Sequence, residues 1–344
     1  MNAATIQSAL HAPRIDGVLP PAALPQGEIE LTGANLGPSE TGAPTVLVAG
    51  ERALVTMSRP GRLALRIPPN AESGLIEVSN SAGVGAAPVR VARMLSDGLH
   101  PVTSPAVSRS GMIYTTISGP RGKETPVSVV RVSQDGRGIP FVSGILNATG
   151  LAFNPDGELF VTSRAEGTVY RVDATGEATV YAEGMGVATG AVFDAAGNLF
   201  VGDRSGTIFK IDAERRIFVH TTLEPSVAAY HLAMSGDGTL FVTGPTLGSN
   251  DAVWAIDPTG EARIWYRGLG RPQGLAVCHE GSVYVAACLH GARGLVRITR
   301  DGKTSMALAG TNLVGIAFSP TGTAVLTTSE AVYDVDLGVQ GMCL

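Results

Sequence analysis

The sequence predicts an all-β protein with two parts, a small β-sandwich followed by a ring of sheets built from six repeats of one phrase. Each repeat has a short apolar strand, a tight turn closed by glycine and a second apolar strand, as in Gly150-Leu-Ala-Phe-Asn-Pro-Asp-Gly-Glu-Leu-Phe-Val. The turn glycines lie at positions 111, 157, 197, 238, 281 and 322. The 44 glycines and 21 prolines in 344 residues also fit many short strands joined by tight turns.

Two further strand-like runs follow the hairpin, as in Thr168-Val-Tyr-Arg-Val-Asp and Glu177-Ala-Thr-Val-Tyr-Ala, so one repeat supplies four strands. Four strands in about 40 residues are typical of one blade of a β-propeller, and six repeats predict a six-bladed β-propeller. The last repeat ends after its third strand, Ala331 to Val335. Its fourth strand is expected either from the tail, Gly338 to Leu344, or from the preceding segment near Met94.

The first 93 residues follow a different pattern. Alternating apolar residues in Glu28-Ile-Glu-Leu, Leu63-Ala-Leu-Arg-Ile and Leu75-Ile-Glu-Val predict half-buried strands. Turn residues recur between these strands at the short spacing of a β-sandwich. The predicted domains are therefore a sandwich over residues 1–93 and a propeller over residues 97–344.

Two phrases of the first domain carry a family resemblance. Gly33 to Gly37 matches a Gly-Xaa-Asn-Leu-Gly turn, and Val78 to Gly83 matches a late Val-Xaa-Asn-Xaa-Xaa-Gly. Both phrases resemble the IPT/TIG family of immunoglobulin-like modules, and the resemblance covers nearly all of residues 12–93. It implies an immunoglobulin-like β-sandwich with a scaffolding role.

Composition limits the classes of partner. A net charge of −5 argues against nucleic acid as the main partner, because proteins that bind nucleic acid normally carry an excess of basic residues. The apolar runs are shorter than the ~18 residues of a membrane span. The start of the chain has neither a basic segment nor an apolar stretch, so a cytoplasmic protein is expected. Cys278, Cys288 and Cys343 show no metal-ligand spacing and are expected to be reduced thiols.

The mouth of the propeller channel is the expected binding site. Alignment of the repeats on their turn glycines places one residue of each repeat at the channel mouth. The residue that follows it in the chain belongs to a second set. The first set is Thr103, Thr149, Thr189, Tyr230, Gln273 and Val314, and the second is Ser104, Gly150, Gly190, His231, Gly274 and Gly315. Tyr230 and His231 are unusually large for their positions, so the fourth blade is expected to narrow the channel.

Loops between the second and third strands should emerge at the same face. They carry Arg121, Lys123, Arg164, Asp203, Arg204, Asn250, Asp251, His290 and Arg293, and neighbouring loops add Arg267 and Arg271. The turns at the opposite face carry Asp156, Glu158, Asp194, Asp237 and Glu280. The arginines either pair with Asp203, Glu166 and Asp251 or form forks that bind a carboxylate or phosphate.

The phrases Thr149-Gly-Leu-Ala-Phe-Asn-Pro-Asp-Gly and Gln273-Gly-Leu-Ala-Val resemble NHL repeats and the gluconolactonase and senescence-marker-protein (regucalcin) family of six-bladed propellers. The resemblance spans residues 100–336. It implies one divalent cation in the channel, held by a Glu before Ser-Pro in the first blade and by Asn or Asp in later blades. In enzymes of that family the metal activates water for attack on a lactone or ester.

The sequence departs from that ligand pattern. Thr103 stands where the Glu is expected, and Thr189, Tyr230 and Gln273 replace the later ligands. A hard divalent cation needs several oxygen ligands, including carboxylates. We therefore expect no metal and no other cofactor.

Two functional classes follow. The first is a propeller that binds a small anionic molecule or a protein partner at the channel mouth. The second is an enzyme, either a lactone or ester hydrolase of the gluconolactonase type or a metal-free lyase that uses His231 with Tyr230. Streptogramin lyases also use a histidine of a repeat propeller as a base. The residues favour binding, because the metal ligands expected of a hydrolase are replaced. Resemblance to a fold that enzymes share does not by itself establish an activity.

Overall fold

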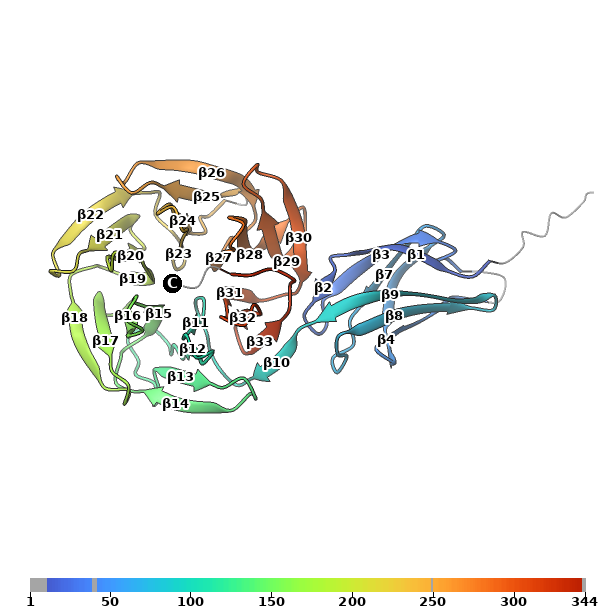
Figure 1. Ribbon diagram of the computed structural model, residues 1–344, viewed down its shortest axis with the longest axis horizontal. Coiled ribbons are helices and arrows are strands. Elements are labelled where there is room, and N and C mark those ends of the chain that lie inside the picture. The colour runs from blue at the N-terminus through green and yellow to red at the C-terminus, as the bar shows by residue number, and fades with distance from the viewer. Residues whose placement is uncertain (1–10, 39–41, 249, 342–344) are drawn as a thin grey trace, which may run out of the picture. The chain divides into compact units, whose positions relative to one another are not determined.

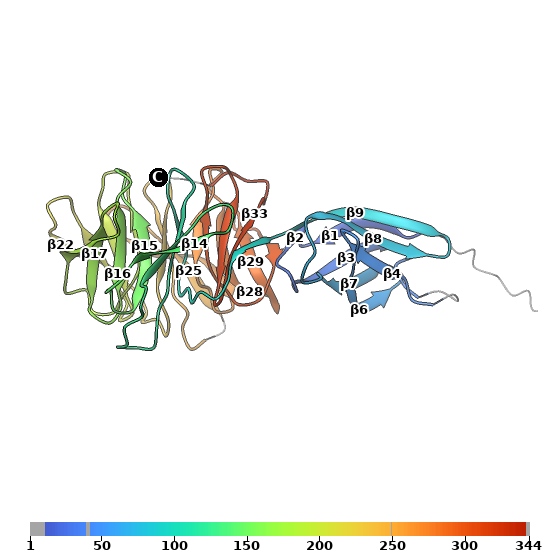
Figure 2. The same ribbon diagram turned by 90° about the horizontal axis from the view of Figure 1, so that it is seen from below.

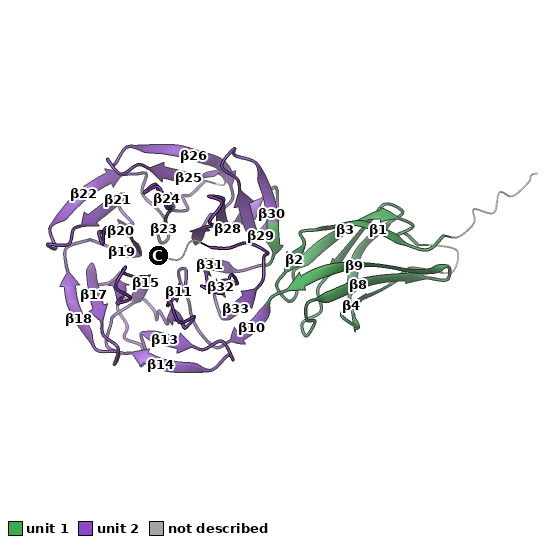
Figure 3. Cartoon of the chain, viewed as in Figure 1, with its two compact units in different colours: residues 1–92, 307–310 green, residues 93–306, 311–344 purple. Residues whose placement is uncertain are grey.

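The computed structural model describes residues 11–38, 42–248 and 250–341, and every regular element in these ranges is a β-strand. The chain divides into two compact units, which are coloured separately in Figure 3. Residues 1–92 and 307–310 form the N-terminal unit. Residues 93–306 and 311–344 form the ring unit. No helix in the described part of the chain is long and apolar enough to cross a membrane.

The N-terminal unit contains two groups of hydrogen-bonded strands. The first runs in the order β1 (Arg14–Leu19), β3 (Glu28–Ala34), β7 (Arg62–Arg66) and β6 (Leu54–Arg59). The second runs in the order β2 (Ala22–Ala23), β9 (Gly83–Val91), β8 (Gly74–Asn80), β4 (Thr45–Val48) and β5 (Glu51–Arg52). Buried residues of both groups, including Leu31, Leu65, Ile76 and Val89, pack in one core. Ala309 belongs to this unit as well and pairs with Ala23.

The ring unit is built from groups of four strands that Figure 1 shows around a common centre. The first is β11 (Ala106–Val107), β12 (Ile113–Thr116), β13 (Val129–Val132) and β14 (Gly138–Val142), and the second is β15 (Ala148–Phe153), β16 (Leu159–Ser163), β17 (Thr168–Val172) and β18 (Ala178–Ala182). The third is β19 (Ala188–Phe193), β20 (Leu199–Asp203), β21 (Thr207–Ile211) and β22 (Ile217–Thr222), and the fourth is β23 (His231–Met234), β24 (Leu240–Thr243), β25 (Asp251–Ile256) and β26 (Ala262–Leu269). The fifth run of neighbouring strands, β27 (Leu275–Val277), β28 (Val283–Leu289), β29 (Ala292–Ile298) and β30 (Thr304–Ala309), is part of a nine-stranded sheet, and residues 307–309 of β30 belong to the N-terminal unit.

A segment from before the repeats completes the sixth group. Its order is β10 (Arg93–Ser96), β33 (Val332–Val335), β32 (Ala324–Thr328) and β31 (Leu313–Phe318). Arg93 pairs with Asp334 along the strands and also forms a two-point ion pair with its carboxylate, at 2.8 and 3.1 Å. Of the two expected sources of the fourth strand, the preceding segment is therefore the one used. Gly341, near the end of the described tail, instead bridges to Cys278.

The predicted glycine turns are present in all six groups. Each turn glycine has a positive φ between 77° and 88°, a conformation that residues with a Cβ rarely adopt. Each glycine N–H donates to the carbonyl three residues earlier, at 2.8 to 3.1 Å. Seen from the side in Figure 2, the strands run between two faces of the ring unit. We call the face that carries these turns the turn face and the opposite one the mouth face.

Candidate functional site

A cavity of about 460 Å³ lies at the mouth face. We call it the mouth cavity. Its charged lining residues are Arg121, Arg164 and Arg204, and no Asp or Glu lines it in the part of the chain that the structure describes. Neutral residues complete the wall, among them Thr149, Thr189, Val227, Ala228, Ala229, Gln273, Val314 and Ser329.

The structure brings together several of the residues predicted at the channel mouth. Those that line the mouth cavity are Thr149, Thr189, Gln273, Val314, Arg121, Arg164 and Arg204. Those that do not are Thr103, Tyr230, His231, Asp203 and Arg271. Arg271 is exposed in a loop with a positive φ of 48°. Residues at equivalent positions of the alignment therefore differ in whether they reach the mouth cavity.

The three arginines reach the cavity from equivalent loops, which join the second and third strands of their groups. Arg164 and Arg204 follow β16 and β20 directly, and both are half-buried. Backbone carbonyls hold them: Arg164 Nη2 donates to Gly119 at 3.3 Å, and Arg204 Nη2 donates to Val227 at 2.9 Å. Among the described residues, no carboxylate oxygen lies within 4 Å of the charged nitrogens of any of the three. The charges of Arg164 and Arg204 are thus held in position but not neutralised, and Arg121 is exposed.

The pKa of Arg164 reflects both its burial and the two neighbouring arginines. Burial, followed by the nearby charges of Arg204 and Arg121, lowers the pKa of its guanidinium below the ordinary value. Arg204 Nε is buried and has no hydrogen-bond partner among the described residues. An anion that supplied acceptors would offset the repulsion between these like charges and could accept a hydrogen bond from the Arg204 Nε.

The acids that could have paired with these arginines are engaged elsewhere. Asp203 Oδ1 accepts a hydrogen bond from Val187 N at 2.8 Å, and its Oδ2 accepts one from the Ser205 hydroxyl. Asp251 Oδ1 accepts from the Thr246 hydroxyl at 2.6 Å. Asp251 Oδ2 has no hydrogen-bond partner among the described residues. None of the ion pairs of the described residues joins Asp203, Glu166 or Asp251 to an arginine.

The threonines of the predicted ring join neighbouring segments of backbone. The Thr103 hydroxyl donates to the Thr149 carbonyl at 2.6 Å, and the Thr149 hydroxyl donates to Asn147 at 2.8 Å. The Thr189 hydroxyl donates to Gly202 at 2.8 Å. Three guanidinium groups beside hydroxyls used in this way do not fit a divalent cation, which needs anionic oxygen ligands. No cluster of three His, Cys, Asp or Glu suited to a metal occurs in the described ranges.

Tyr230 is buried and does not line the mouth cavity, contrary to the expectation that it narrows the channel. Its side chain occupies the space beside two glycines, since a Cβ on Gly202 would meet the Tyr230 Cβ at 2.7 Å and a Cβ on Gly244 would meet the ring at 2.6 Å. Its hydroxyl donates to the Glu224 carbonyl, and burial is the main reason that its pKa rises to about 12. With 2% exposure, Tyr230 is part of the core with Phe200.

His231 is also buried, with 3% exposure, although sequence alignment placed it at the channel. It shares one face of β23 with Ala233, which packs against Leu275 of the next group. Burial lowers its pKa to about 3, so the imidazole is neutral, and its Nδ1 has no partner among the described residues. Glycine occupies this place in most repeats because neighbouring backbones meet there: a Cβ on Gly190 would lie 2.4 Å from the Tyr230 carbonyl.

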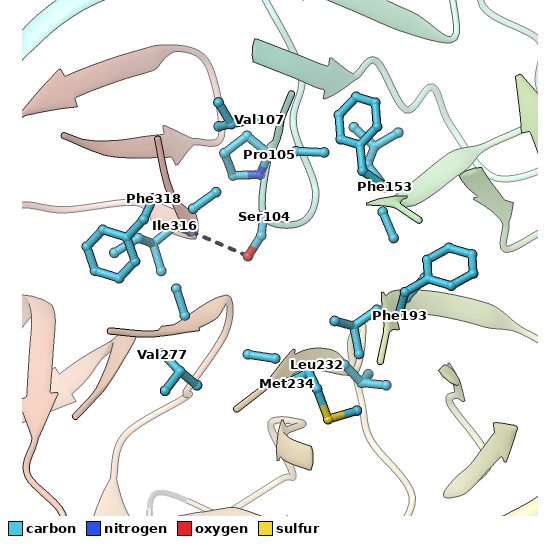
Figure 4. A pocket seen from close by; sticks show the side chains of 18 of the residues that line it. Ser104, Pro105, Val107, Phe153, Phe193, Leu232, Met234, Val277, Ile316 and Phe318 are labelled. Carbon is cyan, nitrogen blue, oxygen red and sulfur yellow. Dashed lines mark hydrogen bonds between the residues drawn. The ribbon is translucent and has the colours of Figure 1, made fainter. Parts of the chain in front are cut away.

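A second cavity, of about 200 Å³, lies among the inner strands and was not predicted. Figure 4 shows its lining of apolar side chains, including Phe153, Phe193, Leu232 and Phe318. The Ser104 hydroxyl accepts a hydrogen bond from Ile316 N at 3.4 Å, drawn as the dashed line. Apart from Arg109, its described lining residues are uncharged. The charged groups suited to recognition therefore gather in the mouth cavity.

Comparisons with known proteins identify the fold. No protein-family model matches the chain, and no curated protein sequence matches it. A solved structure assigned as a gluconolactonase is similar, with a TM-score of 0.62 and 18% identity over 74% of this chain and 94% of its own. The fold is that of a β-propeller. At this level of identity the similarity shows the fold alone.

Two other propeller neighbours cover more of the chain. An auxiliary nutrient binding protein from Bacteroides thetaiotaomicron has a TM-score of 0.54 and 14% identity over 94% of this chain and 98% of its own. A catalytically inactive variant of virginiamycin B lyase from Staphylococcus aureus, solved with quinupristin, has a TM-score of 0.53 and 12% identity over 90% and 98%. Proteins with different roles thus share this fold, and the choice between them depends on the site.

Proposed function

We propose that the ring unit is a six-bladed propeller that binds a small anionic molecule in the mouth cavity, and that the N-terminal unit is an IPT/TIG-like spacer. One observation carries the proposal: Arg121, Arg164 and Arg204 line a single cavity, and no carboxylate among the described residues neutralises them. Guanidinium groups bind carboxylates and phosphates through paired, charge-assisted hydrogen bonds. Because two of the three are held by backbone carbonyls, little side-chain freedom is lost on binding.

Binding of inorganic phosphate tests this proposal. The variant Arg204→Gln removes one charge and retains a polar side chain of similar reach. We expect it to weaken phosphate binding about tenfold or more, as measured by isothermal titration calorimetry at low salt. Arg267→Gln is the matched control, because Arg267 also donates to a backbone carbonyl, that of Asn250 at 3.1 Å, but does not line the cavity.

The two variants define the outcomes. Absence of measurable phosphate binding to the wild type, or equal affinity in Arg204→Gln, would overturn the proposal. A protein partner at the mouth face would then become the better hypothesis. Equal weakening in Arg267→Gln would mean that the overall charge of the ring unit, and not this cavity, attracts the anion.

The enzyme alternatives have less support. A hydrolase of the gluconolactonase type needs a metal, for which the three guanidinium groups are unsuitable neighbours. A lyase that uses His231 needs a base in contact with substrate, yet His231 is 3% exposed and lies outside the lining of the mouth cavity. Tyr230, its proposed companion, donates its hydroxyl to the Glu224 carbonyl. Binding accounts for the same residues without these difficulties.

A further inference from the structure

We infer that the anion bound in the mouth cavity has two parts, a charged head that contacts the three arginines and an uncharged, apolar body that contacts the opposite wall. This inference rests on the proposed function and names the class of ligand. Phosphate monoesters and carboxylates of small aromatic or branched alkyl groups belong to this class. A compact polyanion does not.

The positive charge occupies one side of the cavity. Arg121 follows β12, Arg164 follows β16 and Arg204 follows β20, so the arginines come from the first three of the six groups. These groups are consecutive around the ring (Figure 1). A head group that contacts two or three of the arginines therefore lies on this side of the centre.

The other side of the cavity is uncharged. The fourth group contributes Val227, Ala228 and Ala229, from the segment that leads into β23, and this segment adjoins the charged side because the Val227 carbonyl accepts a hydrogen bond from Arg204. Gln273, from just before β27, represents the fifth group, and Val314, on β31, and Ser329, just after β32, represent the sixth. The Gln273 amide already donates to the Leu313 carbonyl, at 3.4 Å. No described residue that follows β22 and lines the cavity carries a charge.

Because only one side of the cavity is charged, a ligand with several negative charges should bind poorly, whereas a ligand with an apolar body should bind well. A second carboxylate that faced Val314 would lose water without gaining a cationic partner, which is costly. An aromatic or branched alkyl body would instead remove apolar surface from water on both sides. A volume of about 460 Å³ can hold a head group together with a body of this size.

Three probes separate the contributions of head and body: inorganic phosphate, phenyl phosphate and phenol. Each is titrated into the full chain by calorimetry in the same buffer at low salt. We expect phenyl phosphate to bind about tenfold or more tightly than phosphate, because the ring buries apolar surface. We expect no measurable binding of phenol, because the head group supplies the charge-assisted contacts.

A substitution on the uncharged side of the cavity tests where the apolar body of the ligand binds. Val314→Asn introduces a polar group into the wall of the cavity while leaving the arginines in place. It should reduce the preference for phenyl phosphate over phosphate by about fivefold and change phosphate affinity by less than about twofold. Retained phosphate binding also shows that the variant is folded. The control is Val219→Asn on β22, where the side chain is 63% exposed and outside the cavity, and it should leave both affinities unchanged.

The outcomes distinguish this inference from the proposed function. If phosphate binds in an Arg204-dependent way but phenyl phosphate binds no more tightly, the amphipathic ligand is excluded and the anion site stands. A preference for phenyl phosphate that Val314→Asn does not reduce places the body elsewhere and also overturns the inference. If neither phosphate compound binds, both the inference and the proposed function are wrong.

Discussion

At the scale of the single residue, backbone carbonyls determine the behaviour of Arg164 and Arg204. A carboxylate partner would hold each arginine in place but would also neutralise it. The Gly119 and Val227 carbonyls fix the guanidinium groups without neutralising them. The Asp203 carboxylate, one residue before Arg204, instead accepts a hydrogen bond from Val187 N. The loops thus keep positive charge available at the mouth cavity.

His231 provides a prediction about pH. The folded chain holds its imidazole neutral, with a pKa of about 3, whereas the unfolded chain protonates it near the ordinary value of 6.5. Its contribution to stability is therefore fully present above pH 6.5 and is lost as the pH falls from 6.5 toward 3. We expect the free energy of unfolding of the wild type to fall more steeply than that of His231→Gln, by about 1.4 kcal/mol per pH unit.

Urea unfolding between pH 7 and pH 5 measures this difference. Both chains contain the same other titrating groups, so those contributions cancel in the comparison. Parallel pH profiles for the wild type and the variant would mean that the imidazole is accessible to protons in the folded state, in disagreement with its burial.

Side-chain direction also separates what the sequence predicts from what it does not. The position of Arg164 and Arg204 at the mouth follows from counting residues from a turn glycine. The inward rotation of Tyr230 depends on two glycines, Gly202 and Gly244, that leave room beside its ring. Gly202 lies in β20 of the third group and Gly244 just after β24 of the fourth, whereas Tyr230 immediately precedes β23. Only the packed structure shows that they are neighbours of Tyr230.

At the scale of the element, the repeated hairpin is the feature that the sequence predicts best. The turn glycines satisfy a local requirement for positive φ, which is visible in the order of residues alone. The pairing of β10 with β33 joins segments more than 200 residues apart, as Arg93 and Asp334 show. No local pattern distinguishes this pairing from the use of the C-terminal tail, so the sequence left both choices open.

Two neighbouring residues of β10 test its role in the sixth group. Leu95 is 8% exposed and packs with Val325 and Val332, whereas Met94 is 52% exposed. Leu95→Ala should lower the free energy of unfolding of the ring unit by about 2–4 kcal/mol, because it leaves a space in the core. Met94→Ala should change it by less than about 0.5 kcal/mol. Chemical unfolding of both variants makes the comparison, and equal effects would show that β10 is not packed in solution as described.

At the scale of the whole molecule, the charge at the mouth cavity is opposite in sign to the net charge of the chain. The chain carries a net charge of −5, yet the mouth cavity has three guanidinium groups and no described acid. At the turn face the predicted acids Glu158 and Glu280 have cationic partners, Arg171 at 3.6 Å and Arg297 at 3.3 Å. Local potential, and not net charge, therefore governs which ligands the mouth cavity attracts.

This distribution predicts a dependence on salt. Partly exposed charges are screened over a Debye length of about 10 Å at 0.1 M salt. We expect phosphate affinity to fall about three- to tenfold between 20 and 200 mM sodium chloride, measured by calorimetry. Arg204→Gln should show a weaker dependence, because one of the screened charges is gone. An affinity independent of salt would indicate that apolar or neutral polar contacts hold the ligand.

The pairing of β10 with β33 also orders the events of biosynthesis. Residues 93–96 leave the ribosome early, but their strand partner, residues 332–335, is made more than 200 residues later. During that interval the nascent chain carries an unpaired strand edge, which can pair with other chains. The sixth group can form only after residues 332–335 have been made. A polypeptide released before residue 332 therefore keeps this strand edge unpaired.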